Sequence, residues 1–89
     1  MWHNAITNEF IEGFNKFNNV KARVMIQHAL YGTQKANGIL IHTLLDGERV
    51  GIVVDGEEKY IYMDELCAAY IKERECYIMS DVMKIYLKL

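Results

Sequence analysis

The stretch ILIHTLLDGERVGIVVDGEEKYIYM, residues 39–63, decides the fold. Within it, the pairs Asp46-Gly47 and Asp55-Gly56 separate short runs that are rich in β-branched and aromatic residues. An Asp-Gly pair between two such runs indicates a hairpin closed by a type I′ turn, in which both central residues have φ > 0. The stretch therefore predicts a three-stranded antiparallel meander, with strands over residues 38–45, 49–54 and 58–63.

Two further elements are predicted before this meander. An apolar stripe at helical spacing predicts an amphipathic helix over residues 4–17, for which Asn4, Thr7 or Asn8 is a suitable N-cap. The stripe consists of Ile6, Phe10, Phe14 and Phe17. Residues 20–30 then alternate between two faces, as a half-buried strand does, and the polar residues 31–37 are expected to form a connection.

The sequence pattern of the last part of the chain, from residue 64 on, fits more than one structure. Residues 64–73 fit either a short helix capped by Asp64 or a single 3₁₀ turn followed by a strand, and residues 76–88 fit an extended strand. We therefore predict a single domain over residues 1–89, of the α+β class. In it the N-terminal amphipathic helix packs on a small five- or six-stranded antiparallel barrel or strongly bent sheet. Barrel closure would remove the exposed edges of the meander.

The order of these elements over residues 20–71 resembles the Sm-like and SH3-like small β-barrel families. Val24-Met25-Ile26 resembles the first barrel strand, and Gly38-Ile39-Leu40-Ile41 resembles the strand that opens with the family's glycine. Tyr60-Ile61-Tyr62-Met63, followed by Asp64-Glu65-Leu66, resembles the strand and turn before the last strand. The Sm-like resemblance implies an oligomeric RNA-binding protein, but acidic tight turns replace the family's RNA-binding loops.

Composition places the chain among small globular proteins. It has 89 residues, 52% of them hydrophobic, and a formal net charge of −2. Residues 1–45 hold four cations and two carboxylates, whereas residues 46–89 hold six cations and ten carboxylates, so only the first half could supply a basic patch. The start of the chain lacks the pattern of a signal peptide, and no apolar run reaches the roughly 18 residues of a membrane span. We therefore expect a cytoplasmic protein with no membrane partner.

No residue pattern indicates catalysis, a metal or a cofactor. Four potential zinc ligands, His28, His42, Cys67 and Cys76, lack the close pairwise spacing of structural zinc sites. A Cys67–Cys76 disulfide would need an oxidising compartment, which the other features do not favour. The acids near residues 55–58 are expected at a solvated turn, where they would share one environment, whereas a catalytic pair needs two different ones. We therefore expect no enzyme activity.

Two surfaces are candidate binding sites. A nucleic-acid surface would combine cations of the first strand with tyrosines able to stack on bases, namely Lys21, Arg23, Gln27, Tyr31, Tyr60 and Tyr62. Its alternative is an ordinary polar strand face. The helix face formed by Phe10, Phe14 and Phe17, together with Trp2, would be an interface with a partner, and its alternative is a lid on the chain's own barrel.

The function expected from these features is that of a small non-enzymatic interaction module. It would bind a protein partner or itself, as a regulator or inhibitor of that partner. The alternative is an Sm-like oligomeric protein that binds RNA.

Overall fold

The computed structural model describes residues 3–89 and contains one short helix and seven strands. The helix is α1 (Asn8–Asn15), and a 3₁₀ turn, η1 (Met63–Glu65), lies between β4 and β5. The strands are β1 (Val20–His28), β2 (Gly32–Leu45), β3 (Arg49–Val54), β4 (Glu57–Tyr62), β5 (Leu66–Lys72), β6 (Glu75–Ser80) and β7 (Met83–Lys88).

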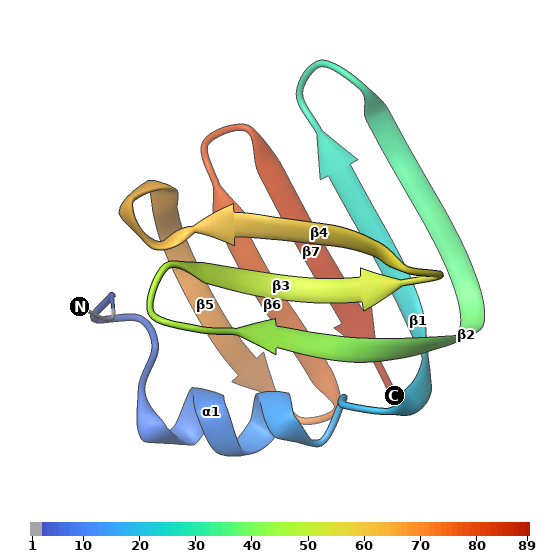
Figure 1. Cartoon of the computed structure of the whole chain (residues 1–89), viewed down its shortest axis with the longest axis horizontal. Coiled ribbons are helices and arrows are strands. Elements are labelled where there is room, and N and C mark those ends of the chain that lie inside the picture. Colours follow the sequence, from blue (N-terminus) through green and yellow to red (C-terminus); the bar gives the residue numbers. More distant parts are fainter. Residues whose placement is uncertain (1–2) are drawn as a thin grey trace.

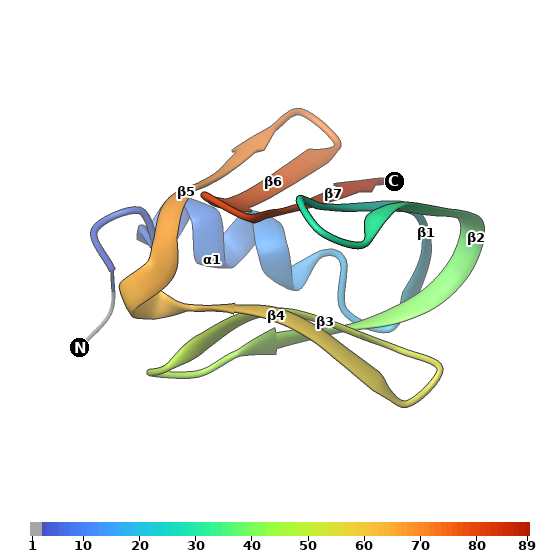
Figure 2. The ribbon, with the colours of Figure 1, turned by 90° about the horizontal axis from the view of Figure 1, so that it is seen from above.

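All seven strands belong to one antiparallel sheet with the order β4-β3-β2-β1-β7-β6-β5. Each strand pairs with its neighbour in the chain except β4 with β5, and β7 returns to pair with β1. Figure 2 shows that the sheet folds over into two layers, one containing β1, β5, β6 and β7 and the other β3 and β4. In Figure 1 the strands of one layer run across those of the other. The sheet stays open between β4 and β5, the two strands at its ends.

The predicted fold class is therefore wrong in three respects. The chain is mostly β rather than α+β, it has seven strands rather than five or six, and its sheet is not closed into a barrel. The additional strands arise at two places: residues 64–73 take the second of their two predicted alternatives, a 3₁₀ turn followed by β5, and a turn after Ser80 divides the expected strand 76–88 into β6 and β7. The chain passes from one layer to the other through η1, and β4 and β5 do not pair, so the sheet stays open.

A β-bulge lies within β2, where this long strand passes between the layers. Ala22 pairs with Ile39, but Val24 pairs with Ala36, so Asn37 and Gly38 together lie opposite Arg23. Gly38 has φ of 63°, a left-handed conformation in which glycine is tolerated without strain. A bulge bends its strand and increases the local twist. Residues 32–37, which were predicted to form a connection, therefore form part of a strand that pairs with β1. The 14 residues of β2 extend through both layers and pair with β1 in one and with β3 in the other.

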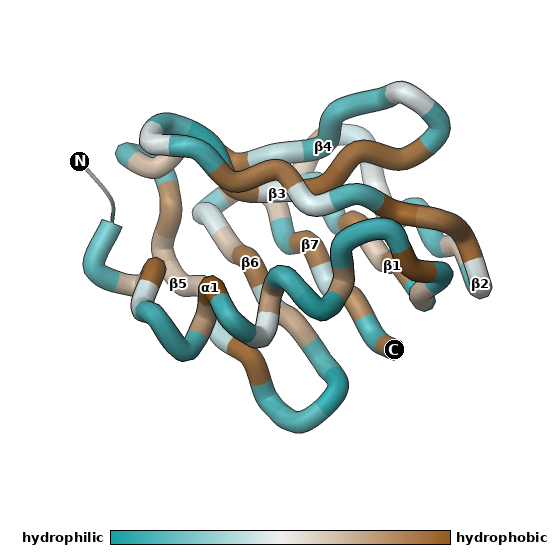
Figure 3. The backbone as a smooth tube through the Cα atoms, turned by 60° about the horizontal axis from the view of Figure 1, so that its bottom comes forward, coloured by the Kyte–Doolittle hydropathy of each residue, from teal (hydrophilic) through white to brown (hydrophobic). Residues whose placement is uncertain are grey.

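Helix α1 closes one end of the space between the layers (Figure 3). Its N-cap is Thr7, whose hydroxyl accepts a hydrogen bond from the Phe10 N–H at 3.0 Å. The helix ends at Asn15, earlier than predicted. The backbone N–H groups of the next three residues, 16–18, donate to carbonyls three residues back, as in a 3₁₀ turn, rather than four residues back as in an α-helix. Asn19, at φ of 59°, then directs the chain into β1.

The core lies between the two layers and the helix. It contains aliphatic residues from both layers and the aromatic residues of the helical segment, and no polar or charged side chain is buried among the described residues. The fully buried large side chains are Phe14, Phe17, Ile41, Ile52, Ile78, Ile85, Leu87, Val50 and Cys76.

Only one of the two Asp-Gly pairs forms the predicted turn. Asp55 and Gly56 have φ of 51° and 78°, as both central residues of a type I′ turn require. Gly47 does not adopt a positive φ. Instead, the Asp46 carboxylate accepts hydrogen bonds from the backbone N–H groups of Glu48 (2.8 Å) and Arg49 (2.7 Å), which stabilises a different turn.

Candidate functional site

A row of tyrosines crosses the outer face of the layer that contains β1, β5, β6 and β7. Tyr70 on β5 pairs in register with Tyr77 on β6, Tyr77 with Tyr86 on β7, and Tyr86 with Met25 on β1. Residues directly opposite one another in a sheet project from the same face. Three tyrosines from three strands are therefore neighbours, although up to 16 positions separate them in the sequence.

Two further rows flank the tyrosines and carry most of the charge. On one side, Lys84 lies between Met79 and Gln27, and on the other side Lys88 lies between Glu75 and Arg23. Lys72 pairs with Glu75, and Lys35 on β2 pairs with Met25. We call this surface the tyrosine–lysine face, and its members are Arg23, Met25, Gln27, Lys35, Tyr70, Lys72, Glu75, Tyr77, Met79, Lys84, Tyr86 and Lys88.

The tyrosine rings pack against one another along the row. The Tyr70 and Tyr77 rings are stacked, with centroids 4.8 Å apart, and the Tyr77 and Tyr86 rings are tilted at 5.0 Å. The Lys84 ammonium lies 5.4 Å from the centre of the Tyr77 ring, within the range of a cation–π interaction. Tyr70, on the end strand of the sheet, keeps 43% of its surface exposed. The row is therefore a broad aromatic surface with its accessible end at β5.

The charge of this face is opposite to that of the whole chain. It carries five cations and one carboxylate, whereas the formal net charge of the protein is −2. Within residues 3–89, none of these five cations forms an ion pair. The ion pairs that this part of the chain does form, Arg49–Asp46, Arg49–Glu58 and Lys59–Glu57, lie on β3, β4 and the turn before β3. The cations of the tyrosine–lysine face are thus free to contact an external anion.

The single carboxylate of the face, Glu75, is held by tyrosine hydroxyls. The Tyr86 hydroxyl donates to one carboxylate oxygen at 2.6 Å, and the Tyr77 hydroxyl donates to the other at 3.4 Å. The hydrogen bond from Tyr86 lowers the pKa of Glu75, and the charge of Lys88 contributes in the same direction. The same hydrogen bond is the main cause that raises the pKa of Tyr86 to about 12. Glu75 is therefore ionised and Tyr86 is protonated at neutral pH.

A shallow hollow adjoins the face at the bulge of β2. It has a volume of about 250 Å³ and is lined by Lys21, Arg23, Lys88, Asn37 and Gly38, among others. The Arg23 Nε donates to the Asn37 side-chain oxygen at 3.0 Å, which fixes the direction of the guanidinium. Three cations therefore converge where β1, β2 and β7 meet.

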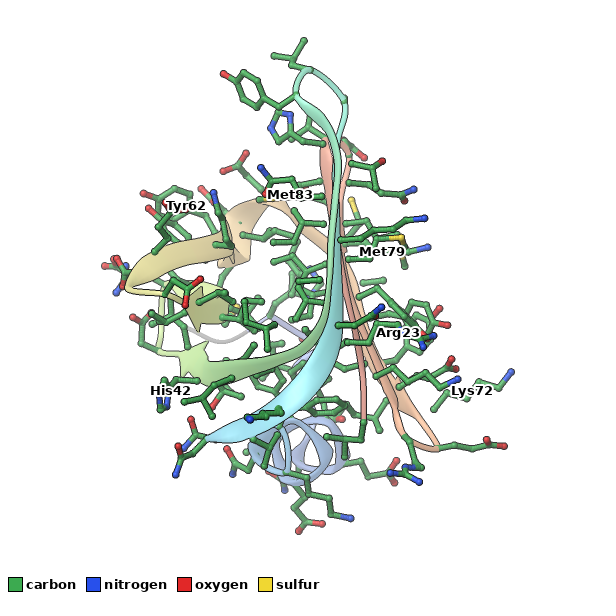
Figure 4. The ribbon with its side chains drawn as sticks, turned by 90° about the vertical axis from the view of Figure 1, so that its right-hand side faces the viewer. Arg23, His42, Tyr62, Lys72, Met79 and Met83 are labelled. Atoms are coloured by element: carbon green, nitrogen blue, oxygen red, sulfur yellow. The ribbon has the colours of Figure 1, made fainter. Side chains whose placement is uncertain are left out.

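The structure divides the six residues predicted as a nucleic-acid surface among three places. Lys21, Arg23 and Gln27 lie on the outer face of β1, as the alternation of that strand predicts, and Arg23 and Gln27 join the tyrosine–lysine face. Tyr31 lies in the turn between β1 and β2 and is 82% exposed. Tyr60 and Tyr62 lie on β4, with hydroxyls 3.1 Å apart, and Figure 4 shows Tyr62 projecting from the side of the molecule opposite to Arg23 and Lys72.

Sequence reasoning missed Tyr70, Tyr77 and Tyr86. The available signal was local: Lys84, Tyr86 and Lys88 alternate with the apolar residues of the last strand, which places them together on its polar face. Their assembly with Tyr77 and Tyr70 depends on the register of three hairpins, which one sequence does not specify.

The second candidate surface, the helix face, is occupied by the protein itself. Phe10, Phe14 and Phe17 are all buried in the core, and the Phe10 and Phe14 rings are stacked 5.1 Å apart. The prediction that this face is an interface with a partner is therefore wrong, because the aromatic side chains pack on the chain's own sheet. Trp2, which was grouped with them, lies outside the described residues.

The potential metal ligands lie in different environments. Cys76 is fully buried, Cys67 is exposed on β5, and both are free thiols. His42 is exposed, whereas the ring of His28 accepts a hydrogen bond from the Leu30 N–H and packs against Tyr31. In the described part of the chain no three His, Cys, Asp or Glu side chains are grouped so that they could hold a metal ion. The only helix there, of eight residues, is too short to cross a membrane.

Comparison with protein-family models, with curated proteins and with solved structures gave no match. The resemblance to small β-barrel families therefore stays a prediction.

Proposed function

We propose that this chain is a non-enzymatic module that binds a single-stranded nucleic acid on the tyrosine–lysine face. The observation that carries the proposal is the gathering of five cations without ion-pair partners around three tyrosines on one face of the sheet. Proteins that bind single strands combine a basic surface for the phosphates with aromatic side chains on which bases stack. Aromatic residues on an open sheet face are one established arrangement for this purpose.

The acidic turns that disfavoured RNA binding in the sequence carry carboxylates that are partly neutralised by ion pairs in the structure. Asp46, Glu57 and Glu58, in or beside the tight turns, each pair with a cation of β3 or β4. They belong to the other layer, although Glu57 lines a hollow together with Lys35, the member of the tyrosine–lysine face that lies on β2. We therefore place nucleic acid ahead of a protein partner, in the reverse of the order expected from the sequence.

A protein partner, or a second copy of the chain, is the second candidate function. Leu30 and Tyr31 are more than 80% exposed at the turn between β1 and β2, and Val82 is 49% exposed at the turn between β6 and β7. A hydrogen bond from the Ala29 N–H to the Val82 carbonyl, 2.8 Å long, joins the two turns. Exposed apolar residues that lie together often mark an interface. We place either activity in the cytoplasm, where free thiols such as Cys67 stay reduced.

The proposal predicts salt-dependent binding that depends on the lysines of β7. A fluorescein-labelled single strand of about 12 nucleotides, as DNA or RNA, suits the site size of small binding folds. We expect its affinity, measured by fluorescence anisotropy, to fall steeply between about 50 and 200 mM salt. The double variant Lys84→Ala/Lys88→Ala should weaken binding and reduce the slope of log K against log salt by about 1.4, because each phosphate contact on a single strand contributes about 0.7.

The matched control removes the same charge from elsewhere. Lys16 follows α1 and Lys59 lies on β4, so the double variant Lys16→Ala/Lys59→Ala should leave the salt slope close to that of the wild-type protein. Absence of binding at low salt, or an equal loss in both double variants, would contradict the proposal.

A further inference from the structure

Glu75 is an anion within a row of cations, on a surface that otherwise attracts anions. It is the only carboxylate of the tyrosine–lysine face, and in the register of the sheet it lies between Lys72 on β5 and Lys88 on β7. Among the described residues, no cation comes within 4.0 Å of its carboxylate. Neither lysine is therefore neutralised by direct contact with Glu75.

The hydrogen-bond donors around Glu75 are those that a phosphate group would use. The hydroxyls of Tyr86 and Tyr77 both point at its carboxylate oxygens, at 2.6 and 3.4 Å. Two hydroxyl donors flanked by two ammonium groups match a phosphodiester, which has two non-bridging oxygens that share one negative charge. Tyr77 also has the Lys84 ammonium over its ring, which keeps a further cation nearby.

We infer that Glu75 occupies the position of a phosphate in this face and competes with nucleic acid for it. The inference rests on the proposed function. In the unbound protein the carboxylate engages the two hydroxyls, and an incoming phosphate must take over these donors against the repulsion of a like charge. Glu75 therefore lowers the affinity of the face for nucleic acid. The effect is largest for ligands that place a phosphate between Lys72 and Lys88.

The test is the substitution Glu75→Gln, which keeps the shape of the side chain and removes its charge. We expect the affinity for a labelled single strand of about 12 thymidines or uridines to rise at least about fivefold, the effect of one unit charge roughly 4 Å from a phosphate in water. Glu75→Ala, which also frees the hydroxyls, should raise affinity in the same direction. The control Glu48→Gln makes the same charge change at the exposed turn before β3 and should alter affinity less than about twofold.

The outcomes separate this inference from the function on which it rests. If the wild-type protein and the Glu75 variants show no salt-dependent binding, both the proposed function and the inference fail. If the wild-type protein binds but the Glu75 variants bind equally or more weakly, only the inference fails, and Glu75 then serves to hold the tyrosines in position. Parallel titrations with DNA and RNA strands show which sugar the face prefers.

Discussion

Replacing Gly51 with alanine is expected to destabilise the protein severely. Gly51 lies in β3, buried between its partners Leu44 on β2 and Tyr60 on β4. A Cβ atom at this position would overlap the carbonyl oxygen of Lys59 and would lie 2.5 Å from the Tyr60 Cα. Both atoms belong to the backbone of β4, so no side-chain rotation relieves the overlap, and β4 must move away from β3.

The expected cost is at or above the upper end of overpacking effects, about 3 kcal/mol. For a domain of this size that corresponds to a fall in the melting temperature of at least about 12 °C. Gly47→Ala is the matched control, because a Cβ there meets nothing within 4 Å and Gly47 is not at positive φ. Thermal unfolding followed by circular dichroism compares the two variants, and equal melting temperatures would show that β3 and β4 are not packed as described.

The second large effect is expected for Phe14→Ala. Phe14 is completely buried, stacks on Phe10 and belongs to the core between the layers. Truncation of a buried Phe costs about 3–5 kcal/mol, through lost transfer free energy and the cavity left behind. Since small domains are stable by only about 5–15 kcal/mol, this variant should be at the limit of folding at room temperature.

Urea unfolding measures this cost, and two other variants keep the result interpretable. Phe14→Leu retains most of the apolar volume and should remain folded with a smaller loss. Asn15→Ala, an exposed change in the same helix, should leave stability nearly unchanged or raise it slightly. Wild-type stability of Phe14→Ala would mean that α1 is not part of the core.

Local sequence signals predicted the elements better than their assembly. The Asp55-Gly56 turn, the alternation of β1 and the apolar stripe of α1 each depend on residues close together in the chain, and each is present in the structure. Asp46-Gly47 shows the limit of such signals. The Asp46 side chain can cap a turn of another type, and the dipeptide alone does not reveal which conformation prevails.

The errors in the fold came from features that depend on distant partners. Asn37-Gly38 lies in a polar segment that resembles a loop, and it becomes a bulge only because β1 lies alongside it. A distant partner also decided between the two alternatives predicted for residues 64–73: β6 pairs with β5, so a 3₁₀ turn and a strand form there, although Asp64 is also a good helix cap. The tyrosine–lysine face also depends on distant partners, since its rows form only when β5, β6, β7 and β1 pair in register.

The most direct test of the proposed function is a map of the binding surface. Nitrogen–proton correlation spectra of the labelled protein, recorded during titration with an unlabelled single strand of about 12 nucleotides, report every backbone amide that changes its environment. We predict shift changes concentrated on β5, β6, β7 and the outer face of β1, strongest near Tyr77, Tyr86 and Lys88. Changes concentrated at the turns of Leu30 and Val82, changes on the β3–β4 layer, or no changes at low salt would contradict the proposed function.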